Sequence, residues 1–375
     1  MKMIHHRLNI LKQILEVTHD IWDRPETRPE VRENFTKMLD CRTPALGWEV
    51  YASATEEKRC YHTCKSRFCP SCGYRATLLW LQEQEAALPE INYAGIVFTM
   101  PRSLWLIFQR NRHLLHDLPA LGAGVIQDWV RLRYGVRVLI LVVPHTFGGD
   151  LKFNCHLHIL VSGGGLQESE GRWIPQLDFN KGALMRMWRY AVITHLRGAL
   201  DAQILKSDLN SQELKQILKD AYERHPYWIT YLDEVVSKAH FVRYAARYIR
   251  RPPIASRRLL RLTDRVVEFL AKDTKKRQSV PTLFSPGAFL ARLAQHVPAR
   301  YRHAIRYFGL LAPRTKGQNW KALFAVLGQQ LQPRPLRLSW RNSLRKCFGI
   351  DPLIDSHGQL MHWVRREKLV TQAVR

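Results

Sequence analysis

The stretch Phe153-Asn-Cys-His-Leu-His-Ile-Leu-Val-Ser162 decides how the middle of this chain folds. It is mostly apolar and rich in large aliphatic side chains, which is typical of a buried strand. Side chains alternate along a strand with a period of two, so His156 and His158 share one face and Leu157 packs on the other. Burying two imidazoles on one face without a polar partner costs free energy. The pattern therefore indicates a shared ligand, such as a metal ion.

An apolar, β-branched run at residues 137–143 precedes this stretch, and Gly148-Gly149-Asp150 lies between the two runs. The arrangement predicts a β-hairpin with a longer loop. Either His145, at the end of the partner strand, or Asp150, in the loop, can complete a metal site with the two histidines. His145 is preferred because it lies on a paired strand. Such a site suits Mg²⁺, Mn²⁺ or another divalent ion.

Two phenols lie four residues apart in Tyr244-Ala-Ala-Arg-Tyr248, within a helical pattern at 234–250 that Pro252-Pro253 ends. Residues at this spacing share one helix face. Such a pair usually packs into a core, but paired phenols can also act as nucleophiles. Nearby arginines favour nucleophiles, since they suit phosphate oxygens and make a phenol easier to deprotonate. These predicted phosphate-binding residues are Arg243, Arg247, Arg250 and Arg251.

Four of the seven cysteines fall within the thirteen residues from Cys60 to Cys72. Such clustering in a chain that lacks a signal peptide indicates metal binding and not a disulfide framework. Cys69-x-x-Cys72 followed by Gly is typical of a zinc-knuckle turn. The predicted ligands of a structural Zn²⁺ are Cys64, Cys69 and Cys72, with Cys60 as the simplest fourth and His62 and Cys41 as alternatives.

The chain is strongly basic: 58 Lys and Arg against 32 Asp and Glu give a formal charge of +26. Such an excess favours a polyanionic partner, and nucleic acid is the commonest one. No basic amphipathic helix stands out as a membrane anchor. The longest apolar stretch, Val138 to Pro144, is too short to span a bilayer, and the N-terminus lacks a signal-peptide core. We therefore expect a cytosolic protein without a membrane partner.

The order of apolar patterns predicts an α+β fold, with an antiparallel sheet flanked by helices. Helices are expected within 5–40 and at 75–87, 180–198 and 210–222, and strands at 93–100, 153–162, 265–269 and 279–284. Three regions follow: a helical and zinc-binding domain at 1–90, a central domain with the two tyrosines at 91–310, and a basic, mostly helical region at 311–375.

Together these motifs resemble the two-tyrosine HUH transposases of rolling-circle insertion sequences. That family has an N-terminal zinc-binding region, a His-hydrophobic-His strand and a later helix with Tyr-x-x-x-Tyr. The matching segments are Cys64–Cys72, His145–Gly148, His156–His158 with Gly164-Gly165, Tyr244–Pro253, Val97–Thr99 with Pro101, and Ile305–Gly309. The similarity runs from about residue 40 to 310. The chain departs from the family pattern in having no cysteine in Trp48–Ala54 and none after Asp351-Pro352-Leu353.

The resemblance implies an HUH nuclease-like fold and a metal-dependent endonuclease and strand transferase acting on single-stranded DNA at transposon ends and targets, in a prokaryotic cytosol or nucleoid. His156 and His158, with His145, would hold the catalytic ion. Tyr244 or Tyr248 would form a 5′-phosphotyrosine, and the other tyrosine would take the next strand. The order of attack and the oligomeric state stay open. Two alternatives also stay open: a replication initiator or relaxase of the same chemistry, and a non-catalytic zinc-dependent DNA-binding regulator.

Overall fold

The computed structural model describes residues 2–224, 228–233, 236–242, 252–273, 278–333 and 335–368. The two tyrosines of the predicted helix, and the four arginines beside them, lie outside the described residues. These are Tyr244, Tyr248, Arg243, Arg247, Arg250 and Arg251. Among the helices that the structure describes, none is both long enough and apolar enough to cross a membrane.

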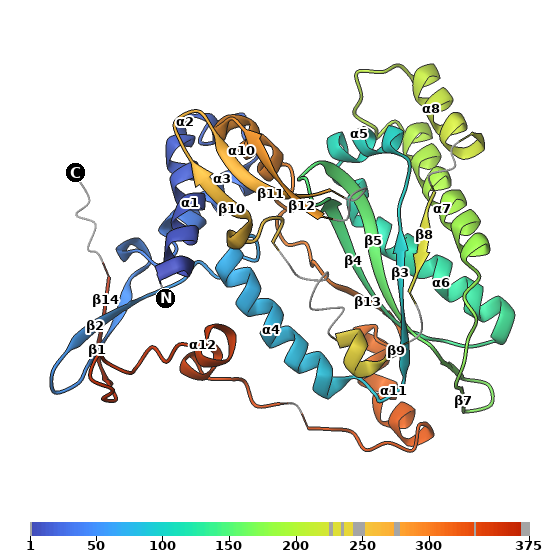
Figure 1. Ribbon diagram of the computed structural model, residues 1–375. Helices are drawn as coiled ribbons and strands as arrows, with labels where there is room; N and C mark the ends of the chain where they lie inside the picture. The colour runs from blue at the N-terminus through green and yellow to red at the C-terminus, as the bar shows by residue number, and fades with distance from the viewer. Residues whose placement is uncertain are drawn as a thin grey trace.

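A six-stranded antiparallel sheet lies at the centre of the molecule (Figure 1). Its strand order is β13-β4-β5-β3-β8, with β9 also paired to β3. The strands are β3 (Asn92–Phe98), β4 (Leu139–Phe147), β5 (Phe153–Ser162), β8 (Thr230–Leu232), β9 (Val236–Ser237) and β13 (Arg306–Gly309). The predicted β4–β5 hairpin is confirmed, and β4 runs further than expected, so that His145 lies within the strand.

Four helices cover one face of this sheet (Figure 1). They are α5 (Arg102–Arg110), α6 (Leu118–Tyr134), α7 (Lys181–Asp201) and α8 (Ser211–Glu223). The stacked rings of Phe98 and Trp188, with centroids 5.1 Å apart, join the sheet to α7. The helix α6 is absent from the sequence-based prediction. Gly122 allows its close approach to β5, because a Cβ there would lie 2.5 Å from a methyl group of Leu157.

The opposite face of the sheet is covered by α4 (Pro70–Ala87) and α11 (Pro313–Val326). Leu141, Val143 and Leu160 point to this side and pack in one cluster with Trp80 of α4. Because side chains alternate along β4 and β5, the three histidines at 145, 156 and 158 extend from the same face. The proposed site therefore lies at the open end of a buried core.

A second sheet, of three strands, packs with the N-terminal helices, which lie far away in the sequence, and with the helix that follows it. The strands are β10 (Leu259–Leu262), β11 (Val267–Asp273) and β12 (Gln278–Phe284), and the helices are α1 (Lys2–Val17), α2 (His19–Trp22), α3 (Pro29–Asp40) and α10 (Pro286–Ala294). They share one hydrophobic cluster, which also contains Cys41, Phe68 and Cys69. This core therefore supports the cysteine region from one side.

The C-terminal region also returns to the cysteine region. Its strand β14 (His362–Glu367) pairs with β1 (Trp48–Ala52), which pairs with β2 (Glu57–Tyr61). Its helix α12 (Trp340–Phe348) lies beside α4. The α+β class with helices flanking an antiparallel sheet is confirmed. The C-terminal region, expected to be mostly helical, contributes the strand β14 as well as α11 and α12. A two-stranded ribbon of β6 (Gly165–Gln167) and β7 (Arg172–Ile174) completes the structure described.

Candidate active site and metal clusters

Three histidines converge on one face of the β4–β5 hairpin. His145 stands directly opposite His156 in the strand register, and His158 is one pleat further along β5. The ring centroids are 4.6 Å apart for His145 and His158, 5.0 Å for His156 and His158, and 5.5 Å for His145 and His156. One ring nitrogen from each histidine lies within 4.8 Å of the others, which one ion can bridge after small side-chain shifts.

The surroundings of these imidazoles keep them in the form that binds metal ions. His156 Nδ1 lies 2.8 Å from the Asn154 carbonyl oxygen and donates to it, which leaves the Nε2 lone pair for an ion. Burial lowers the pKa of His156. Burial, with a smaller effect of His156, lowers the pKa of His158 to about 3. Both rings are therefore neutral near pH 7, as metal ligands must be.

A β-bulge shapes the hairpin beside the cluster. Asn154 and Cys155 of β5 together stand opposite the single residue Thr146 of β4. The buried His296, which follows α10, holds this part of the hairpin from outside the sheet. Its Nδ1 lies 3.2 Å from the Thr146 hydroxyl, and its Nε2 lies 3.0 Å from the carbonyl oxygen of Leu151. The Leu151 carbonyl can only accept, so Nε2 carries the proton and Nδ1 accepts from Thr146.

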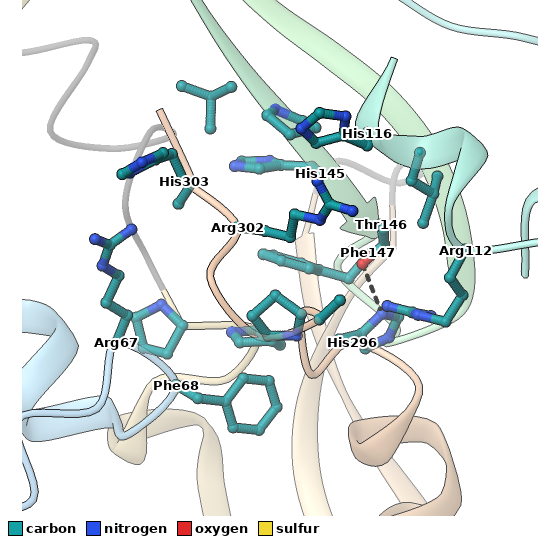
Figure 2. A pocket seen from close by; sticks show the side chains of 18 of the residues that line it. Arg67, Phe68, Arg112, His116, His145, Thr146, Phe147, His296, Arg302 and His303 are labelled. Carbon is teal, nitrogen blue, oxygen red and sulfur yellow. Dashed lines mark hydrogen bonds between the residues drawn. The ribbon is translucent and has the colours of Figure 1, made fainter. Parts of the chain in front are cut away.

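The cluster opens into a cavity of about 710 Å³ (Figure 2). Its lining includes His145 and His156 and a set of positively charged side chains. These are Lys37, Lys65, Arg67, Arg112, Arg302 and Arg306. None of the described residues that line it is Asp or Glu. The cavity therefore favours an anionic ligand, such as the phosphates of a nucleic acid.

The described residues on either side of the tyrosine segment, residues 243–251, contact the histidine-bearing face of the sheet or the cavity. Phe241 packs against Tyr93 of β3 with ring centroids 4.3 Å apart. Val242 is buried in the cluster that covers the histidine face of the sheet. At the other end, Pro252 and Pro253 line the cavity itself. The nine residues between Val242 and Pro252 thus follow a residue buried against the histidine-bearing face of the sheet and precede a residue that lines the cavity.

The second group of metal-binding side chains consists of Cys41, Cys64, Cys69 and Cys72. Cys41 ends α3, and Cys64 donates its backbone N–H to the Cys41 sulfur at 3.4 Å. The structure therefore brings Cys41, and not Cys60, to the other three cysteines, so the preferred fourth zinc ligand of the sequence-based prediction is replaced by one of its alternatives.

The geometry of the four sulfurs fits zinc. Cys72 Sγ lies 3.7 Å from Cys41 Sγ and 3.6 Å from Cys64 Sγ. A tetrahedral ion with bonds of about 2.3 Å holds its sulfur ligands about 3.8 Å apart. Hydrogen bonds from the other thiols lower the pKa of Cys72, while contact with Cys41 raises the pKa of Cys64 and of Cys69. All four can be thiolates together only with a shared cation, which Zn²⁺ supplies.

The remaining candidates have other partners. Cys60 is half-buried on β2 opposite Glu49, and burial raises the pKa of its thiol. The His62 ring contacts the Leu46 carbonyl oxygen at 3.0 Å and the Glu49 carboxylate at 3.1 Å. Asp150 forms an ion pair with Lys152 at 3.0 Å and is not part of the histidine cluster. His145 is therefore the third member of that cluster.

Sequence reasoning missed several residues of the site. His296 stands alone at the end of a helix, and nothing in the sequence marks its contact with the hairpin. Arg112 is half-buried and donates to the carbonyl oxygens of Gln295 and Val297. A basic run without acids from Arg300 to Arg306 was a usable signal for the cavity wall.

Comparison with known proteins agrees with this arrangement. Residues 13–100 match a family described as transposase zinc-binding domain, and residues 140–319 match one described as putative transposase. The two matches define the class of protein: a transposase with an N-terminal zinc-binding region. No solved structure matches the chain.

Two relatives narrow the class. The chain is 33% identical over 332 residues to the transposase for insertion sequence element IS801 of Pseudomonas savastanoi pv. phaseolicola, a match that spans 85% of this chain and 80% of the relative. It is 29% identical over 319 residues to the putative transposase y4qJ of Sinorhizobium fredii (strain NBRC 101917 / NGR234), with 81% and 80% covered. The chain belongs to the IS91/IS801 family of insertion-sequence transposases.

Proposed function

We propose that this transposase cuts and rejoins single-stranded DNA at the ends of its element through a 5′-phosphotyrosine intermediate. The observation that carries the proposal is the histidine cluster itself. It opens into a basic cavity with no acid among the described lining residues. It also lies on the sheet face from which the chain enters the tyrosine segment at Val242.

The proposed reaction assigns the bond changes to the tyrosines. The phenolate oxygen of Tyr244 or Tyr248 attacks the scissile phosphorus, a P–O(Tyr) bond forms, and the P–O3′ bond breaks. The leaving 3′ oxygen takes up a proton and becomes a free 3′-OH. In rejoining, a 3′-OH attacks the phosphotyrosine and restores the phenol, so the exchange needs no ATP. The other tyrosine takes the next strand.

We propose that His145, His156 and His158 bind a divalent ion for this reaction. Such an ion supplies Lewis-acid stabilisation of the charge that develops on the phosphate. The neutral imidazoles keep their lone pairs available, and the carbonyl of Asn154 orients one of them. Because all the protein ligands are imidazoles, we expect Mn²⁺ to bind more tightly than Mg²⁺.

The roles proposed for the arginines and for zinc follow from the same chemistry. Arg243, Arg247, Arg250 and Arg251 would contact the DNA backbone, since guanidinium groups suit phosphate oxygens. The zinc cluster would be structural: it fixes the loop from Cys64 to Cys72 against α3 and α4. The family assignment favours a transposase over an initiator or relaxase of the same chemistry.

Metal-dependent nicking of oligonucleotides that carry the element ends tests the proposal. We expect cleavage with Mn²⁺ or Mg²⁺ and none with His156→Ala, because that variant removes an ion ligand. Binding of the same oligonucleotide should persist in the variant, since phosphate contacts come from other residues. Strand binding without cleavage by the unmodified protein would instead support a non-catalytic regulator.

A further inference from the structure

The cavity beside the histidine cluster has two basic walls that come from distant parts of the chain. One wall is the segment from Cys64 to Phe68, which we call the zinc loop, with α3 behind it. The other wall is the segment from His296 to Arg306, which we call the distal loop. The strands that carry the histidines lie between the walls, and Figure 2 shows Arg67, Arg302 and His303 around the same hollow as His145.

The zinc loop presents two exposed cations to the cavity. Lys65 has a positive backbone φ of 54°, an unusual conformation for a residue with a Cβ. Its neighbour Cys64 belongs to the cysteine cluster, which holds the loop in this shape. Gly73 lets α4 pack closely below, because a Cβ there would lie 2.5 Å from the Arg67 carbonyl oxygen. Lys65 and Arg67 are thus fixed by their backbone, while their side chains stay accessible.

The distal loop offers a matching set of donors. Arg302 and His303 are exposed at the cavity, and Arg306 donates to the His116 carbonyl oxygen at 3.3 Å beside them. Among the described residues, no carboxylate forms an ion pair with Lys65, Arg67 or Arg302. By contrast, the cavity residue Lys37 already pairs with Glu33 at 2.5 Å. Both walls thus carry cations that have no acidic partner among the described residues. Such an arrangement suits an extended polyanion better than a single small anion.

An exposed aromatic ring marks the rim of the distal loop. Tyr301 is 97% exposed and has a positive φ of 59°, although it lies directly beside the cavity residue Arg302. Such a conformation costs free energy of order 1 kcal/mol or more and gains no packing here. An exposed ring next to phosphate-binding cations is the usual platform for an unpaired base.

We propose that the zinc loop and the distal loop together grip one DNA strand, with Lys65, Arg67 and Arg302 on its phosphates and Tyr301 against a base. The inference rests on the proposed function and deepens it. The zinc cluster then has a consequence beyond stability, since it fixes one wall of the channel that leads the strand to the histidines. A flexible single strand can follow the cavity, and its exposed bases can stack on Tyr301.

The salt dependence of binding tests the phosphate contacts. The full chain carrying Tyr244→Phe and Tyr248→Phe, without added divalent ion, is titrated with a fluorescent single-stranded oligonucleotide at several salt concentrations. Each of Lys65→Ala, Arg67→Ala and Arg302→Ala should reduce the slope of log K against log salt by about 0.7, the value for one single-strand phosphate contact. Arg131→Ala, which removes a 66% exposed arginine on α6, should leave the slope unchanged.

The stacking contact is tested in the same titration. Tyr301→Ala should weaken single-strand binding about tenfold, and Tyr301→Trp should restore it, because both aromatic rings offer a stacking face. Tyr190→Ala, which removes a 62% exposed tyrosine on α7, is the matched control and should bind like the parent. Duplex binding should not respond to Tyr301→Ala, since paired bases cannot stack on the ring.

Measured zinc content separates a lost contact from a damaged loop. Arg302→Ala lies outside the zinc loop, so it keeps the test valid even where Lys65→Ala or Arg67→Ala loses zinc. An unchanged slope in Arg302→Ala and in the zinc-loaded zinc-loop variants would overturn the proposal, whether or not the unmodified protein nicks DNA. If the unmodified protein does not nick DNA but the variants show reduced slopes, the proposed chemistry is overturned. The proposed contacts of the two loops with the DNA strand are then still supported.

Discussion

At the scale of single residues, groups that do not touch the proposed ion orient the histidines and fix the hairpin that carries them. The bulge opposite Thr146 places the Asn154 carbonyl where it accepts from His156. The buried His296 then ties Thr146 to the Leu151 carbonyl across the hairpin end. A ligand set held in this way loses little side-chain freedom when it binds an ion.

The neutral state of His296 leads to a pH prediction. Burial lowers the pKa of His296 to about 4, against an ordinary value of about 6.5. Between those values the unfolded chain takes up a proton that the folded chain excludes, so stability falls as pH falls through this window. The loss should approach about 1.4 kcal/mol per pH unit for this one group. It should be absent in His296→Gln, which keeps an amide donor and acceptor but does not titrate.

Urea unfolding of both proteins from pH 7 to pH 4.5 measures this difference. The stability advantage of the parent over His296→Gln should shrink as the pH falls, since other titrating groups contribute equally to both. Parallel pH profiles for the two proteins would contradict the assignment of a neutral, buried His296.

Much of the histidine cluster could be predicted from single residues because the strand period of two is a short-range rule. It places His156 and His158 on one face, and the hairpin brings His145 to their side. The cavity wall that contains Arg302 could not be predicted in the same way. Its position depends on how the segment after α10 packs against the hairpin, which no local pattern encodes.

At the scale of elements, the zinc cluster shows where local reasoning ends. Spacing alone selects Cys60, which is near Cys64 in the sequence. The strand β2, however, carries Cys60 into register with Glu49, and the end of α3 delivers Cys41 to the other sulfurs instead. The choice between two cysteines is thus made by the packing of a helix, which residue spacing does not reveal.

Two cysteine-to-serine substitutions should differ in their effects on zinc binding and stability. Cys41→Ser should lose the bound zinc and lower the melting temperature, because a structural zinc site stabilises the fold through all four of its ligands. Cys60→Ser should keep both the zinc and the stability of the parent. Zinc stoichiometry by elemental analysis, together with thermal unfolding, measures the two effects. Zinc loss in Cys60→Ser with retention in Cys41→Ser would restore the ligand set first expected.

The helix α6 was missed for a related reason. Gly122 and Gly124 weaken its helical pattern, since glycine disfavours a helix by about 1 kcal/mol relative to alanine. At Gly122 the absence of a side chain, which causes this cost, also allows close packing against Leu157. Local propensity and tertiary packing disagree at this position, and packing wins.

At the scale of the whole molecule, the described part of the C-terminal region packs beside the zinc region. The strand β14 pairs with β1, and Asp355 accepts hydrogen bonds from the hydroxyl groups of Ser53 at 2.7 Å and Thr55 at 3.1 Å. The predicted regions 1–90 and 311–375 therefore share a sheet. Pairing between residues about 300 positions apart cannot be read from sequence patterns, so the mostly helical pattern of the tail gives no sign of the strand β14.

This closure predicts a long-range effect of Asp355→Ala. Loss of the side-chain acceptor should loosen the turn before β14 and speed amide hydrogen exchange in β1, which lies far away in the sequence. Asp128→Ala removes a 52% exposed carboxylate from an ion pair on α6 and serves as the control. Hydrogen exchange followed by mass spectrometry should show faster exchange in β1 for Asp355→Ala and not for Asp128→Ala. Equal exchange of β1 in both variants would mean that the turn at Asp355 does not stabilise β1.

In our proposal, the histidine cluster and the tyrosine segment form one active site that makes a covalent bond to DNA. Incubation of the transposase with a labelled single strand of the element end, followed by denaturing electrophoresis and peptide mass spectrometry, measures whether this bond forms and on which residue. We predict a divalent-ion-dependent adduct on Tyr244 or Tyr248 that disappears in the variant carrying both Tyr244→Phe and Tyr248→Phe. An adduct that persists in this double variant, or one attached to another residue, would show that these tyrosines are not the nucleophiles.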